Sequence, residues 1–208
     1  GLGLAMFGIG SLTEAYLSLA WNPWVFFAWY LFGAILTAAW IGHGTVYLLV
    51  RKKRADILTV ILVTASVLAA ILLLWTMPQL DSGQFTTAEP ISEQYRSMMP
   101  PISEGGIVRL TTPFFNIYGL ITLVGGALYS SYLFWRKRVL PNRVIGNVLI
   151  AVGALTIASA STMTRLGYGS VLYLGELLAA TLMFSGFLVA AAPRPAAEKD
   201  ETATAPVA

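Results

Sequence analysis

The sequence predicts an all-α protein, a bundle of about six transmembrane helices in a lipid bilayer. Composition is the first observation, because 57% of the 208 residues are hydrophobic, only 11% are charged and the mean hydropathy is +0.72. A soluble domain carries about 25% charged residues. Long uncharged runs are the second observation, since roughly 20 apolar residues cross a bilayer. Such runs lie between Asp56 and Pro78, between Arg109 and Arg136, and between Arg143 and Arg165.

Continuous runs favour helices, because the strands of a membrane barrel alternate in segments of about 10 residues. Asn22-Pro23 separates the first two spans, since proline pushes the residue before it out of the helical conformation. Asp56 is expected to open the third span. Trp21, Trp24, Trp29 and Tyr30 indicate an interfacial aromatic belt. The six expected spans cover about residues 1–19, 24–50, 56–77, 112–135, 143–163 and 170–192.

These spans make one helical domain, residues 1–192, followed by a tail at 193–208. Gly1 is not an initiator Met and the first apolar segment has no flanking charge, so six spans become seven if a helix precedes it. The tail is rich in Pro, Ala, Glu and Thr without apolar periodicity, and we expect it to be disordered.

The connection 78–111, about 34 residues long, is the one sizeable loop. It is too apolar for a plain linker, so we expect it to lie on the membrane surface or to fold over the helix ends. The tetrapeptide Pro-Ile-Ser-Glu occurs at 90–93 and again at 101–104. We expect each copy to start a short helical turn.

Basic residues predict the orientation of the bundle. Eight of the thirteen Lys and Arg residues lie in two short connections, 51–54 and 136–143. Cytoplasmic loops carry such an excess, so we expect both connections and the C-terminal tail in the cytoplasm, in the cell membrane, with the 78–111 loop outside. Placed at helix ends, these charges face lipid headgroups, and no nucleic-acid partner is expected despite the pI of about 9.3.

Small residues predict where helices pack closely. They recur at three- and four-residue spacing in the last three spans, which is typical of helix–helix contact in membranes. We therefore expect the last three helices to form a compact unit. The residues concerned are Gly125, Gly126, Ser130, Ala151, Ala154, Ala158, Gly175 and Ala179.

Polar residues at one depth give the candidate ligand site. An ionisable group inside a membrane costs a few kcal/mol and is a functional candidate by default. Counting 1.5 Å per residue, we place one polar layer roughly 10 Å below the outer surface. An outward-facing pocket for a cation, a proton or an amine is one interpretation, and a buried hydrogen-bond and salt-bridge cluster is the other. The layer consists of Glu14, Asn116, Arg165, Tyr173 and Glu176.

His43 is the only histidine and lies between Gly42 and Gly44 near the inner end of the second span. A single histidine can ligate a haem or chlorophyll-type pigment, which makes His43 the candidate cofactor-binding residue. The alternative is a hydrogen bond to a neighbouring helix. Bis-histidine haem is excluded, and retinal is disfavoured because no lysine lies within a span. No cofactor is assigned.

The residue composition limits the kinds of chemistry that the protein can carry out. Without cysteine there are no disulfides and no thiolate sites. Three functions remain open. The first is a small transporter or ligand-binding membrane protein that uses the polar layer. The second is a non-catalytic accessory or scaffolding subunit of a larger membrane complex, with or without a pigment or quinone, and the third is an intramembrane enzyme acting on lipid or isoprenoid. Besides the bilayer, the second function implies a membrane-protein partner or a second copy of the chain.

Overall fold

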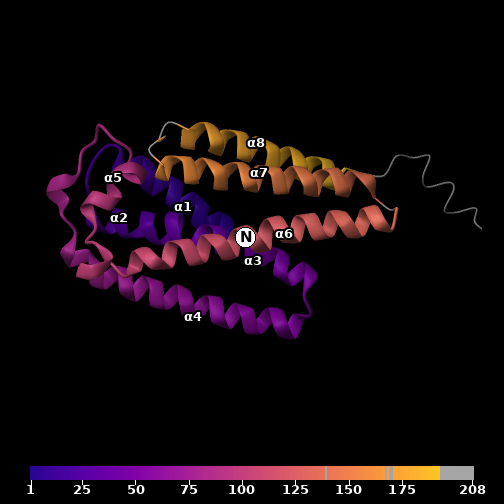
Figure 1. Ribbon diagram of the computed structural model, residues 1–208, viewed down its shortest axis with the longest axis horizontal. Helices are drawn as coiled ribbons and strands as arrows, with labels where there is room; N and C mark the ends of the chain where they lie inside the picture. The colour runs from indigo at the N-terminus through magenta and orange to yellow at the C-terminus, as the bar shows by residue number, and fades with distance from the viewer. Residues whose placement is uncertain (139, 167, 169–170, 193–208) are drawn as a thin grey trace, which may run out of the picture.

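The computed structural model describes residues 1–138, 140–166, 168 and 171–192, together with the backbone but not the side chain of Arg165. The predicted tail at 193–208 lies outside the described residues. Within the described part the chain forms helices and no strand, which confirms the all-α bundle (Figure 1). Five helices are long and apolar enough to cross a membrane, namely Pro23–Leu49, Lys52–Gln79, Val108–Arg136, Pro141–Thr164 and Val171–Ala191.

Two ends of the bundle differ in character (Figure 1). One end, the loop end, carries the long connection and its short helices. The other, the basic end, carries the turns at 50–51 and 137–140. In chain order the elements are α1 Leu2–Leu17, α2 Pro23–Ala28, η1 Trp29–Leu36, α3 Thr37–Leu49, α4 Lys52–Thr76, η2 Met77–Gln79, η3 Ser82–Gln84, α5 Ile91–Met98, η4 Ile102–Glu104, α6 Val108–Arg136, α7 Pro141–Arg165 and α8 Val171–Ala191.

The first expected span is shorter than the others. Helix α1 has 16 residues, about 24 Å of rise, which is less than the roughly 30 Å of hydrocarbon in a bilayer. It packs on η1 and α3, where a Cβ on Gly10 would collide with Gly33 and one on Gly3 with Ile41. Gly1 lies near the middle of the long axis, so α1 covers the half of these helices nearer the loop end (Figure 1).

The second span is one continuous helix with a widened middle. Asn22 caps its start, with Oδ1 accepting hydrogen bonds from the backbone N–H groups of Trp24 at 2.9 Å and Val25 at 3.2 Å. Pro23 occupies the first turn, where its missing N–H costs nothing. Residues Trp29–Leu36 are π-helical. The sequence pattern did not predict this segment, and π-helical turns are frequent at functional sites.

The predicted close-packing faces are largely present. Ala151 and Ala154 of α7 are buried in one cluster with Val124 and Ala127 of α6, and Gly175 and Ala179 of α8 are buried where α8 packs along α7. At Gly175 a Cβ would overlap the Ala160 methyl group. Helix α6 joins this pair through α7, so the last three helices form the expected unit. Gly125 is different, because it faces open space and its neighbour Gly126 makes the contact instead.

The long connection folds over the ends of the helices at the loop end, one of the two expected arrangements. Ile91, Met98 and Met99 are buried in one apolar cluster with Trp29 and Tyr30. The aromatic-belt prediction is therefore wrong for Trp29 and Tyr30, which are 5% and 1% exposed. Residues of the long connection cover both rings, so they lie in the protein interior and not at the membrane interface.

Both Pro-Ile-Ser-Glu copies start a helical turn, as predicted. Helix α5 begins at Ile91 and η4 at Ile102, each directly after proline. The buried Gln94 side chain fixes the approach to α5. It donates to the carbonyls of Thr86 at 2.8 Å and Glu89 at 2.6 Å, and it accepts from the Thr86 N–H at 2.8 Å.

The start of α4 differs from the prediction. The helix begins at Lys52, four residues before Asp56. Instead of capping the helix, Asp56 forms a 2.8 Å salt bridge with Lys52. An i,i+4 pair of opposite charges supports a helix rather than ending it.

Candidate functional site

Three residues of the predicted polar layer come together at the loop end. Glu14 lies in the last turn of α1, and Tyr173 and Glu176 lie near the start of α8. The charges of Glu14 and Glu176 and the Tyr173 hydroxyl are near enough to interact electrostatically. Two helices from opposite ends of the chain thus contribute to one cluster, which we call the Glu14 cluster.

The long connection adds a residue that the sequence did not single out. The Ser92 hydroxyl, in the first turn of α5, lies beside the Glu14 carboxyl and the Tyr173 hydroxyl. Neither Glu14 Oε1 nor Ser92 Oγ has a hydrogen bond of good geometry within the described part of the chain, although both atoms are buried. Buried polar atoms are normally paired, and each unpaired one costs about 1–3 kcal/mol.

Aromatic rings form the inner wall of the Glu14 cluster. The Trp29 side chain lies beside the Glu14 carboxyl. Its ring centroid is 5.7 Å from that of Tyr95 in α5 and 5.9 Å from that of Tyr30. Trp29 is the first residue of the π-helical segment, so the irregular turn of the second span lies next to the carboxylate.

The opposite side of the cluster is open. Tyr173 is 47% exposed and Glu176 is also exposed on the surface of the chain, whereas Glu14 is half-buried. Charged side chains do not face lipid without cost. The arrangement therefore combines a shielded carboxylate with an accessible one.

Asn116, a fourth residue of the predicted layer, does not belong to this cluster. Asn116 donates its amide hydrogens to the backbone carbonyls of Ala34 at 3.0 Å and Thr112 at 2.9 Å. It thereby ties α6 to η1. Arg165 ends α7, and its side chain lies outside the described residues.

His43 is buried between three helices and has a hydroxyl partner at each ring nitrogen. Nδ1 lies 2.6 Å from the Tyr118 hydroxyl of α6, and Nε2 lies 2.8 Å from the Thr59 hydroxyl of α4. A ligated metal needs one nitrogen lone pair. Because both nitrogens are occupied, the geometry favours the hydrogen-bonding alternative over pigment ligation.

Hydrogen bonds continue from His43 to the basic end. The Tyr47 hydroxyl lies 2.7 Å from Thr59 Oγ1 and 3.1 Å from Asp56 Oδ1, and Asp56 accepts from Lys52. A carboxylate only accepts, so Tyr47 donates to Asp56. Thr59 then donates to Tyr47, sharing its proton with the Ala55 carbonyl 2.9 Å away. If His43 donates from Nε2 to Thr59, Tyr118 donates to Nδ1. Each hydrogen bond between these side chains then has one donor and one acceptor.

Among the described residues, no group of three or more His, Asp or Glu side chains could hold a metal ion. The Glu14 cluster has two carboxylates with neutral hydroxyl and indole groups. Such a donor set suits a proton or an ammonium group better than Ca²⁺ or Mg²⁺, which take six or more oxygen ligands.

Comparison of the chain with protein-family models, with curated proteins and with solved structures finds no match. Functional inference therefore depends on the residues themselves.

Sequence reasoning did not identify Ser92 or Trp29 as part of this cluster. A neutral hydroxyl in a loop and a tryptophan in an apolar run carry no signal of their own. The first Pro-Ile-Ser-Glu copy offered a partial signal, because it placed Ser92 in the first turn of a short helix in the long connection.

Proposed function

We propose that the protein is a membrane protein that binds a small organic cation, an alkylammonium ion, at the Glu14 cluster. The observation that carries the proposal is the buried Glu14 Oε1, which has no hydrogen bond of good geometry within the described part of the chain. A cation bound beside it would supply the missing donor and would neutralise a carboxylate that is costly in a low-dielectric layer.

The surroundings of the carboxylate support an organic cation over a bare metal ion. Trp29 and Tyr95 place aromatic rings beside the carboxylate, and aromatic rings attract ammonium groups. Ser92 and Tyr173 supply hydroxyl oxygens that accept from an N–H donor. Glu176, at the exposed edge, would attract a cation as it enters.

Ligand titration tests the proposal. Calorimetry on the detergent-purified protein should show saturable binding of ethylammonium or diethylammonium, which carry N–H donors, and weaker binding of Na⁺. Glu14→Gln should weaken binding by about 30-fold or more, because breaking a buried charge pair costs roughly 2 kcal/mol or more. Glu176→Gln should have a smaller effect, because Glu176 is exposed.

Glu104→Gln is the matched control, since Glu104 is an exposed carboxylate in η4 at the same end of the bundle. It should bind like the wild type. Equal affinity of wild type and Glu14→Gln, or no saturable binding of any of the three ions, would refute the proposal. Uptake of the bound ion into proteoliposomes would extend it from binding to transport.

A second candidate function is that of an accessory subunit. Helix α8 packs along α7 and exposes its other face, including Leu174, Leu177 and Phe187 together with Glu176. A helix of another membrane protein covering this face would shield Glu176 from lipid. Native mass spectrometry after mild extraction would then show a second chain, whereas a monomer that binds cations would support the first function alone.

We also propose that the basic end is cytoplasmic and that the Glu14 cluster opens to the outside. The chain has no cysteine, so single cysteines report the topology cleanly. Ser103→Cys at the loop end should react with a membrane-impermeant maleimide on intact cells, and Lys53→Cys should react only after lysis. The reverse pattern would invert the orientation.

A further inference from the structure

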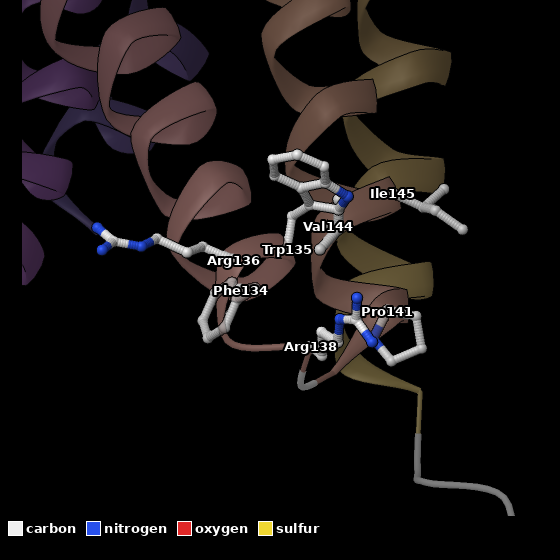
Figure 2. Close-up of a pocket in the computed structure, with 7 residues that line it drawn as sticks. All are labelled: Phe134, Trp135, Arg136, Arg138, Pro141, Val144 and Ile145. Atoms are coloured by element: carbon white, nitrogen blue, oxygen red, sulfur yellow. The ribbon is translucent and has the colours of Figure 1, made fainter.

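An open groove of about 640 Å³ lies at the basic end, where α6 turns into α7 (Figure 2). It is far along the bundle from the Glu14 cluster and has no part in the proposed cation site. Its lining combines basic, aromatic and aliphatic side chains, namely Phe134, Trp135, Arg136, Arg138, Pro141, Val144 and Ile145.

The groove lies between a basic side chain, Arg138, and an aromatic one, Trp135. The Trp135 ring lies against α7 near Val144, and the Arg138 guanidinium lies beside Pro141, while Arg136 points to the other side of α6 (Figure 2). Backbone hydrogen bonds fix the turn, with the Arg138 N–H donating to the Trp135 carbonyl at 3.0 Å. The turn thus places Arg138 at the mouth of the groove.

Positive charge around this turn has no internal counterion in the described part of the chain. Arg136, Lys137, Arg138 and Arg143 are exposed, and the salt bridge found among the described residues, Lys52–Asp56, belongs to the other basic turn. Arg143 packs over the Phe134 ring at 5.7 Å. An anion at this turn would therefore meet positive charge that no described carboxylate neutralises.

The walls of the groove favour an anion with an apolar body. Trp135 is 69% exposed and Ile145 is 54% exposed. Exposed apolar residues continue along both helices towards the membrane interior, with Tyr132 on α6 and Val148 on α7. Indole rings prefer the headgroup level of a bilayer. Free inorganic phosphate would contact only the basic residues of such a groove and not its apolar walls.

We propose that this groove binds one anionic phospholipid, with its phosphate at Arg138 and its acyl chains along Trp135 and Ile145. Basic pockets at the ends of transmembrane helices recognise lipid headgroups through the same combination of charge and interfacial position. The α3–α4 turn is equally basic, with Lys53 and Arg54 exposed, and it provides an internal comparison.

Native mass spectrometry of the purified full chain tests the proposal with phosphatidylglycerol and phosphatidylcholine. Wild type should retain phosphatidylglycerol preferentially, and inorganic phosphate should not displace it. Arg138→Gln should weaken phosphatidylglycerol binding about fivefold, the typical effect of one basic residue at an anionic surface. Lys53→Gln, with the same charge change, should leave it unchanged.

A substitution that leaves the charge unchanged distinguishes a specific lipid site from nonspecific attraction by surface charge. Trp135→Ala should also weaken phosphatidylglycerol binding, whereas Trp24→Ala, at an exposed tryptophan of the loop end, should not. Equal losses in Arg138→Gln and Lys53→Gln would overturn the proposal, because surface charge alone would then explain binding. So would displacement by inorganic phosphate, or equal retention of phosphatidylcholine.

Discussion

His43 and Glu14 are both polar residues within apolar helices, yet their surroundings differ in a way that separates structure from function. Each ring nitrogen of His43 has a hydroxyl partner within 2.8 Å. Among the described residues Glu14 Oε1 is buried without a hydrogen bond of good geometry, although the Ser92 hydroxyl and the Trp29 side chain lie beside the carboxyl. A satisfied group rigidifies the helices around it, whereas an unsatisfied one retains affinity for a ligand. We therefore propose that His43 contributes to stability and that Glu14 binds the cation.

Replacement of Tyr118 tests the assignment of His43. Tyr118→Phe removes the donor at 2.6 Å and leaves Nδ1 buried and unpaired. It should lower the free energy of unfolding by about 1 kcal/mol, as typical hydrogen bonds between membrane helices do. Denaturant titration in detergent measures the loss.

Tyr132→Phe is the control on the same helix, because that tyrosine is 49% exposed. If both variants unfold alike, the hydroxyl of Tyr118 contributes nothing to stability and the role given to His43 is wrong.

Single residues were predictable only where charge made them conspicuous. Glu14 and Glu176 were identified because ionisable groups in apolar runs are rare and costly. Asn116 was included for its depth alone, and depth does not give the rotation of a helix about its axis. Ser92 and Trp29 became part of the cluster through tertiary folding, which no local pattern encodes.

Helices were predictable as elements because run length, proline and basic residues act locally. The five long helices and the shorter α1 follow the expected order. Two features of elements were not predictable. The segment Trp29–Leu36 is π-helical and packs against α1. Helix α4 begins one turn earlier than expected, at Lys52, and its exposed i,i+4 salt bridge with Asp56 adds modest support to this first turn.

Two glycines of α6 test how closely the elements pack. A Cβ on Gly119 would overlap the Ala38 carbonyl of α3, whereas one on Gly125 would meet no atom within 4 Å. Gly119→Ala should therefore destabilise the protein by about 2 kcal/mol, as overpacking does. Gly125→Ala should stabilise it by up to about 1 kcal/mol through helix propensity.

Thermal unfolding of both variants in one detergent measures the difference. Similar melting temperatures for the two would mean that α3 and α6 do not approach closely at Gly119, and the packing described for the centre of the bundle would have to be revised.

At the scale of the whole molecule, the sequence predicted the class of protein but not which helices meet. Packing of α7 on α8 follows from small residues and a short connection, both of which are visible in the chain. The approach of α1 to α8 at the loop end joins residues about 160 positions apart, and the long connection closes over it. This arrangement brings Glu14, Ser92 and Glu176 together, and it is the central claim.

Cross-linking tests that claim most directly, because the natural chain contains no cysteine. With a short bifunctional thiol reagent, Glu14→Cys/Glu176→Cys should form an internal link in membranes. Glu14→Cys/Leu188→Cys should not, since position 188 lies about 18 Å further along α8. A link at 14/176 alone is the result that we predict. No link in either variant, or equal linking in both, would contradict the arrangement.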